Sequence, residues 1–381
     1  MDPIRMVDLK KQYDFIKEEV DGALAEVLNA TTFINGPAVK EFQSDLERYL
    51  GVKHVIPCAN GTDALQIALM GLKLEPGDEV ITADFTFAAT VEVIGLLKLT
   101  PVLVDVDPQT YNIDPAAIKA AITPRTKAII PVHLFGQAAN MEAIMALAKK
   151  HNLYVVEDNA QGIGATYTFS DGSRAKTGTI GHLGTTSFFP SKNLGAYGDG
   201  GAIFTNDDDL AHFIRGIVNH GMYQRYYHDV VGVNSRLDSM QAAVLKVKLQ
   251  YLDFYNERRK EAAIRYSTLF EGHPNIFVPF RKGNCHSHVF HQYTLRIINH
   301  NRDGLVDHLN AHNIPCGIYY PVPLHRQKAY CEPEIDETPF PVTNQLVNEV
   351  IALPMHSELS VEQIDHIARQ VLSFLDDSSK N

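Results

Sequence analysis

The sequence predicts an α/β protein in which a mostly parallel central sheet forms a large domain, followed by a smaller α+β domain. Strand and helix patterns alternate from about residue 40 to residue 205, which is typical of a parallel sheet covered by helices. Four runs there read as strands: residues 80–83, 100–106, 128–132 and 154–157. The 381 residues are also enough to bury two cores. We therefore expect a large domain over residues 1–253 and a small C-terminal domain over residues 254–381.

The second part of the chain has fewer regular patterns. Residues 236–260 have a strong helical pattern and link the two expected domains. Residues 291–298 and 314–320 are rich in β-branched and aromatic side chains, so we expect strands there. The Tyr-Pro-Val-Pro sequence at residues 320–323 predicts a stiff turn that faces the cleft beside the large domain.

Composition limits the classes of partner. A net charge of -11 argues against nucleic acid or a membrane surface as the main partner. No apolar stretch reaches the roughly 18 residues that a transmembrane helix requires. The cysteines have no paired spacing and no signal peptide precedes them, so we expect free thiols in a reducing cytoplasm. These cysteines are Cys58, Cys285, Cys316 and Cys331.

Lys192 lies in an unusual setting for a lysine. Apolar residues precede it in Ser187-Phe-Phe-Pro-Ser-Lys192, and a glycine-rich stretch follows at residues 195–201. An amine in partly apolar surroundings loses hydration, so its pKa falls and the free base can act as a nucleophile. Such amines form Schiff bases with aldehydes, including that of pyridoxal 5′-phosphate (PLP). Taken alone, the pattern also fits an ordinary loop lysine beside a glycine turn.

Asp158 ends a β-rich run that reads as a buried strand of the parallel sheet. Ligands of α/β proteins bind beyond the carboxyl ends of such strands, and a carboxylate there can keep a pyridinium nitrogen protonated. Glu157 alternates to the other face of the strand, so Asp158 is the candidate. The alternative is that Asp158 caps a following helix. Phe87 could stack on an aromatic cofactor ring or belong to the core.

An anion site is predicted where a strand at residues 54–56 runs through Asn60-Gly61-Thr62 into an apolar helix. The free N–H groups of a helix N-terminus, with Gly61 allowing close approach, suit a phosphate ester. Ser187 could add a hydroxyl to this site. The alternative is that Asn60 or Thr62 only caps the helix.

Four residues form a cluster of another kind: Cys285, His286, His288 and His291 could be zinc ligands. On a strand, however, His286 and His288 share one face while His291 points to the other. No second Cys/His pair elsewhere completes a tetrahedral set. We therefore expect solvated histidines at a sheet edge and no metal site.

Short motifs follow one another in a fixed order from Val7 to His356. They are residues 60–65, 85–87, 131–137, 157–161, 187–195, 198–202, 234–238, 241–243 and 320–324. Together they resemble the DegT/DnrJ/EryC1/StrS family of nucleotide-sugar aminotransferases. This resemblance implies the PLP fold-type I architecture, with PLP as the cofactor.

The resemblance also implies roles for the residues singled out above. Lys192 would hold PLP as a Schiff base and then, once freed, carry the proton of the donor's Cα. Asp158 would pair with the ring nitrogen, Gln161 would contact the phenolic oxygen, and Phe87 would cover one face of the ring. The phosphate would be held by Asn60, Gly61, Thr62 and Ser187. L-Glutamate and a keto-sugar nucleotide would use this site in turn, in ping-pong order.

In the family, the segment that matches residues 234–236 reaches the active site of the neighbouring subunit. The resemblance therefore implies that Asn234 contacts the phosphate and that Arg236 contacts the sugar. Each site would then need two chains, which makes the homodimer obligatory. The alternative is that Arg236 pairs with Asp238 or caps the following helix.

Residues 60–66 and 233–238 resemble most closely the enzymes that aminate C3 of a 3-keto sugar nucleotide. One of these acts on UDP-2-acetamido-2-deoxy-3-oxo-glucuronate in the biosynthesis of surface polysaccharide and lipopolysaccharide. Arg236 could bind the C6 carboxylate of such a substrate with two hydrogen bonds. Those enzymes carry a histidine before the Tyr-Pro pair, where this chain has Tyr319 followed by Tyr320. A dTDP-linked 3-keto- or 4-keto-6-deoxyhexose therefore stays an alternative.

Two further classes were weighed against an aminotransferase. Relatives that perform a PLP-dependent 3-dehydration have a histidine where Lys192 stands, so Lys192 argues against that reaction. A non-catalytic regulatory protein with the same fold is the second alternative, because a fold does not fix a function. The presence of Lys192, Asp158 and Gln161 together with the phosphate loop argues against it.

Overall fold

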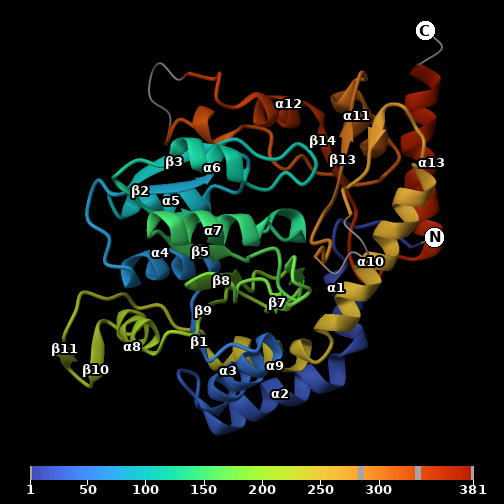
Figure 1. The fold of residues 1–381 in the computed structure, drawn as a ribbon. Coiled ribbons are helices and arrows are strands. Elements are labelled where there is room, and N and C mark those ends of the chain that lie inside the picture. The colour runs from blue at the N-terminus through green and yellow to red at the C-terminus, as the bar shows by residue number, and fades with distance from the viewer. Residues whose placement is uncertain (1, 282–286, 331–335, 379–381) are drawn as a thin grey trace.

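A seven-stranded, mostly parallel sheet lies at the centre of the computed structural model, which describes residues 2–281, 287–330 and 336–378 (Figure 1). The strand order is β1-β9-β8-β5-β4-β2-β3. Neighbouring strands from β8 to β3 are parallel, whereas β9 runs antiparallel to β1 and β8. The strands are β1 (His54–Cys58), β2 (Glu79–Ala83), β3 (Thr100–Val104), β4 (Thr126–Ile130), β5 (Tyr154–Asp158), β8 (Leu183–Ser187) and β9 (Gly201–Thr205). The α/β fold with a mostly parallel sheet is thus confirmed.

Side chains of the central strands alternate between two apolar layers, one on each face of the sheet. The predicted runs at residues 80–83, 100–106, 128–132 and 154–157 correspond to β2, β3, β4 and β5, with ends that differ by one or two residues. Successive residues enter opposite layers, as the pleat of a strand requires. The alternating pairs are Val80 and Ile81, Ala128 and Ile129, and Val156 and Val155.

Helices cover both faces, so β2, β4 and β5 are almost wholly buried, whereas the edge strand β3 is only partly buried. The first layer is completed by α4 (Gly61–Gly71), α5 (Ala89–Leu96) and α8 (Asp208–Ile217). The second is completed by α6 (Pro115–Ala121), α7 (Met141–His151) and α12 (Pro341–Glu349). Asp207 caps α8 by accepting hydrogen bonds from two backbone N–H groups, and the acidic side chains of Asp208 and Asp209 follow in its first turn.

Three helices gather at the β1 edge of the sheet (Figure 1). They are α2 (Lys17–Ala30), α3 (Pro37–Leu50) and α9 (Ser239–Leu249), whereas α1 (Leu9–Phe15) precedes α2 and lies beside the start of the later helix α10 (Leu252–Leu269). The expected helix over residues 236–260 is in fact two helices, because the chain turns at Tyr251 before α10. The break allows α9 to pack against α3 while α10 runs to a different core.

That second core lies around a three-stranded antiparallel sheet. The sheet consists of β12 (Ile276–Phe277), β13 (Tyr293–Ile297) and β14 (Val350–Leu353), and is covered by α10, α11 (Arg302–Ala311) and α13 (Val361–Ser378). The strand expected at residues 291–298 is β13. The strand expected at residues 314–320 is wrong: only Gly317 pairs there, with Ala352 of β14, because Pro315 has no N–H to donate. The proposed domain boundary at residue 253 falls at the start of α10.

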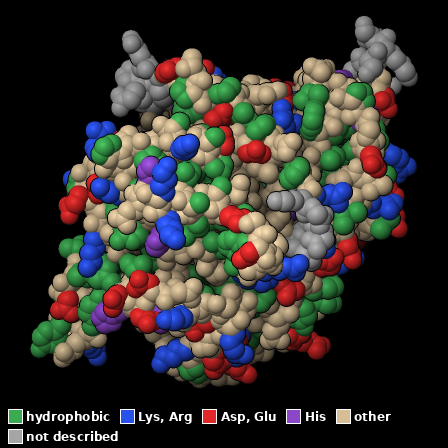
Figure 2. Space-filling model, viewed as in Figure 1, with side chains coloured by type: hydrophobic (Ala, Val, Ile, Leu, Met, Phe, Trp, Pro, Cys, Tyr) green, Lys and Arg blue, Asp and Glu red, His purple; other side chains and the backbone are tan. Residues whose placement is uncertain are grey.

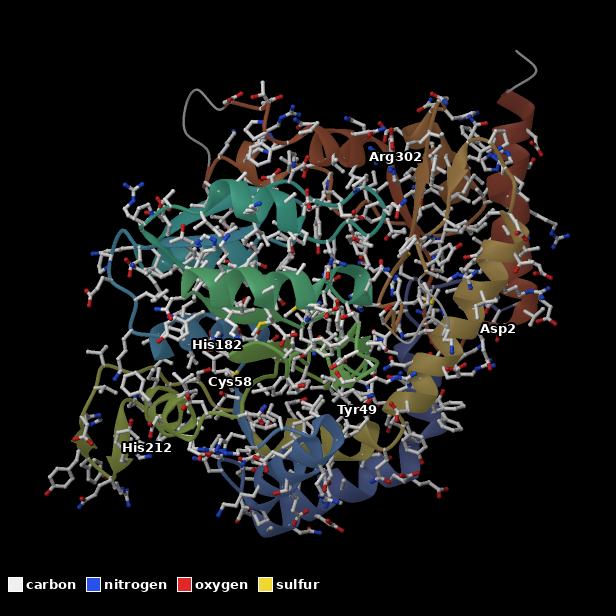
Figure 3. The ribbon with its side chains drawn as sticks, in the orientation of Figure 1. Asp2, Tyr49, Cys58, His182, His212 and Arg302 are labelled. Atoms are coloured by element: carbon white, nitrogen blue, oxygen red, sulfur yellow. The ribbon has the colours of Figure 1, made fainter. Side chains whose placement is uncertain are left out.

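Shorter elements connect these layers. They are β6 (Thr166–Thr168), β7 (Arg174–Lys176), β10 (Met222–Gln224), β11 (Tyr227–His228) and the 3₁₀ turns η1 (Leu134–Gly136) and η2 (Leu324–Arg326). Basic and acidic side chains are interspersed over the face seen in Figure 2. Within the described ranges, none of the helices has the length and apolar character to cross a membrane. Cys58, which lies in the interior (Figure 3), and Cys316 are free thiols, whereas Cys285 and Cys331 lie outside the described residues.

Candidate active site

A cavity of about 920 Å³ opens beyond the carboxyl ends of β2, β4 and β5. Ten of the predicted site residues line it: Asn60, Gly61, Thr62, Phe87, Asp158, Gln161, Ser187, Lys192, Tyr319 and Tyr320. These residues come from positions up to 260 apart in the sequence, yet they surround one space large enough for a cofactor and a substrate. Asn234 and Arg236 do not line this cavity in their own chain.

Lys192 enters the cavity from the loop between β8 and β9. Its backbone N–H donates to the carbonyl of Phe189 at 2.8 Å, which folds the loop into a turn. Burial lowers the pKa of the Lys192 ammonium to about 8, although the negative charge of Asp158 acts in the opposite direction. The unprotonated fraction of the amine near neutral pH is therefore far larger than for an ordinary lysine, as the apolar residues before it predicted.

Asp158 is held by two hydrogen bonds at the end of β5. Oδ1 accepts from the backbone N–H of Ala160 at 3.1 Å, and Oδ2 accepts from the hydroxyl of Thr90 at 2.8 Å. The chain after Asp158 forms turns, so Asp158 does not cap a helix. Thr90, from the start of α5, is a residue that the sequence analysis missed, although it follows the Phe85-Thr-Phe87 motif closely.

Glu157 does not line the cavity, as the strand alternation predicted, and is fully buried. Its carboxylate accepts from the backbone N–H groups of Gly178, Ile180 and Gly181 at 2.6 to 2.8 Å, and from Nε2 of His133 at 2.9 Å. His133 was also missed. Its backbone N–H donates to the carbonyl of Asp158, so the pair ties the end of β5 to the chain that leaves β4.

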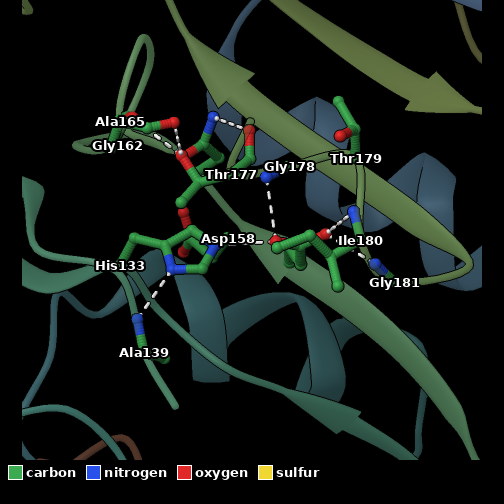
Figure 4. Close-up of polar contacts among 12 residues, drawn as sticks. His133, Ala139, Asp158, Gly162, Ala165, Thr177, Gly178, Thr179, Ile180 and Gly181 are labelled. Atoms are coloured by element: carbon green, nitrogen blue, oxygen red, sulfur yellow. Dashed lines mark hydrogen bonds and ion pairs between the residues drawn. The ribbon is translucent and has the colours of Figure 1, made fainter. Parts of the chain in front are cut away.

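The protonation of His133 follows from its two partners. Nδ1 accepts a hydrogen bond from the backbone N–H of Ala139 at 3.1 Å and so carries no proton (Figure 4). Nε2 must then be the protonated nitrogen, which donates to Glu157. A neutral imidazole and an ionised carboxylate with four donors make a fully satisfied buried network.

The N-terminus of α4 forms one end of the cavity. The side chain of Asn60 accepts from the N–H of Asp63 at 2.8 Å, so it caps the helix, as the alternative held. Gly61 approaches Ser187 so closely that an added Cβ would lie 2.6 Å from the Cβ of Ser187. Only glycine therefore lets the free N–H groups of the helix and the hydroxyl of Ser187 meet in one anion-binding corner.

Aromatic side chains form a wall of the cavity. Phe87 is 57% exposed, which excludes a role in the core, and its ring lies 6.2 Å from that of Tyr320. Gln161 accepts from the N–H of Phe135 at 2.6 Å and donates to the hydroxyl of Tyr320 at 3.1 Å. The Tyr320 phenol is buried, which raises its pKa. Tyr319 and Pro321 line the cavity beside it, as expected for residues 320–323.

A buried hydrogen-bonded pair, Asp84 and His325, fixes this wall to the sheet. Asp84, which follows β2, accepts from the backbone N–H of His325 at 2.8 Å and contacts Nδ1 of the same residue at 2.6 Å. Its carbonyl accepts from the N–H of Leu324. Asp84 and His325 were not among the predicted site residues, because 241 positions separate them.

The expectation of solvated edge histidines is wrong for the two that the structure describes. His288 is 4% exposed, stacks on Phe290 and accepts from that residue's N–H at Nδ1. His291 is half-buried and lines the cavity near Lys192. Both are covered because residues 287–292 pair with the chain around η1. The proposed zinc ligands Cys285 and His286 lie outside the described residues.

Ser235 anchors the segment that carries Asn234 and Arg236. The hydroxyl of Ser235 accepts from the N–H of Ala59 and donates to Asp63 at 2.6 Å. Asn234 is exposed, and Arg236 forms no hydrogen bond or ion pair with any residue that the structure describes. Asp238 caps α9 and does not pair with Arg236, so the local alternative for Arg236 is wrong.

Known proteins resemble this chain over nearly its full length. Residues 14–372 match the DegT/DnrJ/EryC1/StrS aminotransferase family. The chain is 46% identical to a "pleiotropic regulatory protein" of Geobacillus stearothermophilus, over 97% of this chain and 98% of that protein. It is 46% identical to UDP-2-acetamido-2-deoxy-3-oxo-D-glucuronate aminotransferase of Pseudomonas aeruginosa, over 95% and 97%.

Two further relatives extend the comparison. UDP-N-acetyl-3-dehydro-alpha-D-glucosamine 3-aminotransferase of Acidithiobacillus ferrooxidans is 45% identical over 96% of both chains. The crystal structure of a DegT/DnrJ/EryC1/StrS aminotransferase from Brucella abortus superposes with a TM-score of 0.92 at 41% identity, covering 97% of this chain and 99% of that one. The match in sequence, fold and cavity leads to one conclusion: the chain belongs to the DegT/DnrJ/EryC1/StrS aminotransferase family.

Proposed function

We propose that the protein is a PLP-dependent aminotransferase that moves an amino group from L-glutamate to the 3-keto group of UDP-2-acetamido-2-deoxy-3-oxo-glucuronate. One observation carries the proposal. A lysine with a lowered pKa, Lys192, shares a cavity with the buried carboxylate of Asp158 and with the N-terminus of α4. The product would serve the biosynthesis of surface polysaccharide and lipopolysaccharide, and we place the enzyme in the cytoplasm.

The residues around the cavity fit PLP. Lys192 supplies the amine for a Schiff base, and Asp158, held in place by its donors Thr90 and Ala160, suits a protonated ring nitrogen. Gln161 would contact the phenolic oxygen and Phe87 would cover one face of the ring. The phosphate would be held by Asn60, Gly61, Thr62 and Ser187, with Asn234 of the second chain. When bound, PLP supplies an electron sink for the carbon that loses its proton.

Lys192 would act as the base and then as the acid. A group with a pKa near the working pH both takes and returns a proton efficiently, and the lowered pKa of about 8 gives Lys192 that property. The aromatic wall of Phe87, Tyr319 and Tyr320 would exclude water from the same space. We infer that Tyr319 and Tyr320 also contact the sugar.

We infer further that the active enzyme is a homodimer with shared sites. Arg236 has no partner among the described residues of its own chain, and it lies on the segment that Ser235 anchors beside α4. In the dimer, its guanidinium would bind the C6 carboxylate of the sugar in the neighbouring site.

A mixing experiment tests the shared site. Lys192→Ala and Arg236→Ala subunits, each inactive alone, are unfolded together and refolded as a mixture. If Arg236 acts in the neighbouring subunit, mixed dimers contain one complete site and activity returns. Persistent inactivity of a mixture that forms dimers would contradict the proposal.

The amino-transfer function has a direct spectroscopic test. The purified protein is expected to be yellow, with a cofactor absorbance band that borohydride abolishes, and L-glutamate alone is expected to convert that band. The Lys192→Ala variant is expected to bind PLP but to complete neither half-reaction of amino transfer. A regulatory function is the second candidate, because one of the most similar relatives is called a regulatory protein. A colourless protein that takes up no PLP would favour that candidate.

The sugar is identified by a panel of UDP- and dTDP-linked keto sugars. The glucuronate is expected to react with the highest kcat/KM. A faster reaction of UDP-N-acetyl-3-dehydro-glucosamine, which has no C6 carboxylate, would show that the enzyme does not recognise that group. Preference for a 3-keto- or 4-keto-6-deoxyhexose would instead agree with the tyrosine at position 319.

A further inference from the structure

His291 is a cavity-lining residue with a defined chemical state. Burial, together with the positive charges of Lys192 and Arg259, holds the pKa of the His291 imidazole well below its ordinary value, so the ring is neutral. A neutral imidazole has one nitrogen that donates and one that accepts a hydrogen bond. Which nitrogen faces the cavity as an acceptor follows from the hydrogen bonds behind the ring.

A chain of amides fixes this tautomer. Nδ2 of Asn256 donates to the carbonyl of Ile163 at 3.2 Å, so its Oδ1 must accept, and it does so from Nδ2 of Asn193 at 2.7 Å. Nδ2 of Asn193 also donates to the carbonyl of Val289 at 3.1 Å. Oδ1 of Asn193 is therefore an acceptor, and Nδ1 of His291, 3.3 Å away, carries the proton. Nε2 of His291 consequently has a free lone pair.

The backbone around His291 is fixed as well. Nη1 of Arg259 donates to the carbonyls of Phe290, His291 and Met355 at 2.9 to 3.2 Å. Gly136, at a φ of +94°, packs so tightly that an added Cβ would lie 2.8 Å from the backbone nitrogen of His291. Such constraints on the main chain and on the ring tautomer are typical of a side chain whose hydrogen-bonding direction is important for function.

We propose, on the basis of the function proposed above, that His291 is a positioning residue for Lys192. When the cofactor and the amino donor fill the cavity and the amine of Lys192 has been released, Nε2 of His291 accepts a hydrogen bond from the Lys192 ammonium and so holds the proton carrier over the substrate carbon. In the structure the two side chains share the cavity without bonding to each other, so this contact requires a rotation of the Lys192 side chain. Both side chains line the same cavity, and Asn193, the partner of His291, follows Lys192 directly. Lys192 Nζ and His291 Nε2 are both accessible from the cavity, because neither is a fully buried polar atom that lacks a hydrogen-bond partner.

Two substitutions separate the two nitrogens of the ring. His291→Asn keeps a donor for Asn193 at the position of Nδ1 but removes the acceptor at Nε2, whereas His291→Gln offers an oxygen near the position of Nε2. For the half-reaction with glutamate, His291→Asn is expected to lower the rate constant about 10- to 100-fold. The Cα-deuterium isotope effect is expected to increase, and His291→Gln is expected to recover part of the rate.

A double-mutant test links the effect to Lys192. In Lys192→Ala, methylamine added to the buffer can serve as the proton carrier. His291→Asn is expected to change this rescued rate by less than about twofold, because its partner is gone. An undiminished loss in the Lys192→Ala background would overturn the proposal, since His291 would then act on the substrate or on the fold.

A measurement without turnover completes the test. In the pyridoxamine phosphate form, Lys192 is free, and the pH dependence of its acetylation, followed by mass spectrometry, gives its pKa. Loss of the acceptor in His291→Asn is expected to lower that pKa, whereas an unchanged or raised pKa would contradict the proposal. His288→Asn is the control: it alters a buried histidine nearby and should leave the pKa of Lys192 unchanged.

Failure of the positioning role and failure of the proposed function give different results. If the wild-type protein shows no half-reaction with any amino acid, the proposed function is wrong. If the wild type reacts and His291→Asn reacts equally fast with the same isotope effect, only the role of His291 is wrong.

Discussion

The hydroxyl of Thr90 donates a 2.8 Å hydrogen bond to Oδ2 of Asp158, across 68 positions of sequence. This bond orients the carboxylate that we propose for the cofactor nitrogen. A bond to a charged group is worth more than one between neutral groups, so its loss should be measurable.

Thr90→Val is expected to weaken PLP binding and to slow the glutamate half-reaction, each by about tenfold. Thr90→Ser keeps the hydroxyl and should restore both. The dissociation constant is measured from the cofactor absorbance and the rate by stopped flow. Thr82→Val removes a buried hydroxyl that bonds to the carbonyl of Ile130, away from the cavity, and serves as the control. Equal losses in both valine variants would show that Thr90 only stabilises the sheet.

Glu157→Gln is expected to destabilise the fold by about 2–4 kcal/mol, measured by urea denaturation. The carboxylate accepts from four donors, and an amide can accept at one end only, so some N–H groups of residues 178–181 would lose their partner. Glu92→Gln on the exposed side of α5 should change the stability by less than about 0.5 kcal/mol. A loss this small for Glu157→Gln would mean that water or a flipped amide compensates.

Arg236→Lys tests the recognition of the sugar. If the guanidinium binds a C6 carboxylate with two hydrogen bonds, the KM for the uronic acid nucleotide should rise at least about tenfold, while that for a 6-deoxy analogue should change little. Steady-state kinetics with both substrates provides the comparison. Equal increases for the two sugars would contradict the carboxylate contact.

Lys248→Met is expected to stabilise the protein at neutral and lower pH. Burial lowers the pKa of Lys248 to about 7, opposed by Glu358 and assisted by Arg259, and Nζ has no hydrogen-bond partner among the described residues. Between this pKa and the ordinary value of 10.5, the unfolded chain holds a proton that the folded chain does not, so stability rises with pH through that window. Below about pH 7 the folded protein also carries the charged Lys248, so the full free-energy cost of burying that charge is present.

The gain in Lys248→Met should therefore be about 1–4 kcal/mol near pH 6 and should shrink as the pH rises to about 9. Urea denaturation at several pH values measures it. Lys246→Met removes an ammonium from the same helix, but one that is partly exposed and paired with Glu41, and should show no such pH dependence. A destabilised Lys248→Met at every pH would indicate that the contact of Lys248 with the ring of Tyr197 outweighs the desolvation cost.

The parts of the fold that depend on local pattern were predictable. The four predicted strands and the motifs around Lys192 and Asp158 can each be recognised within about ten residues of sequence. Tertiary pairing was not predictable in the same way. Thr90, His133 and His325 owe their positions to strands and turns that only the folded sheet brings together. His291 was placed at a solvated edge because the covering chain at η1 lies about 155 residues upstream.

The pairing of Asp84 with His325 also bears on the order in which the enzyme is made. The ribosome releases Asp158 and Lys192 well before residues 319–325, so at that stage the chain still lacks the segment that closes one side of the cavity. The cavity gains its last wall only when residues 319–325 dock on Asp84. A chain that ends before residue 325 therefore lacks one side of the cavity, and a truncated translation product cannot form a complete site.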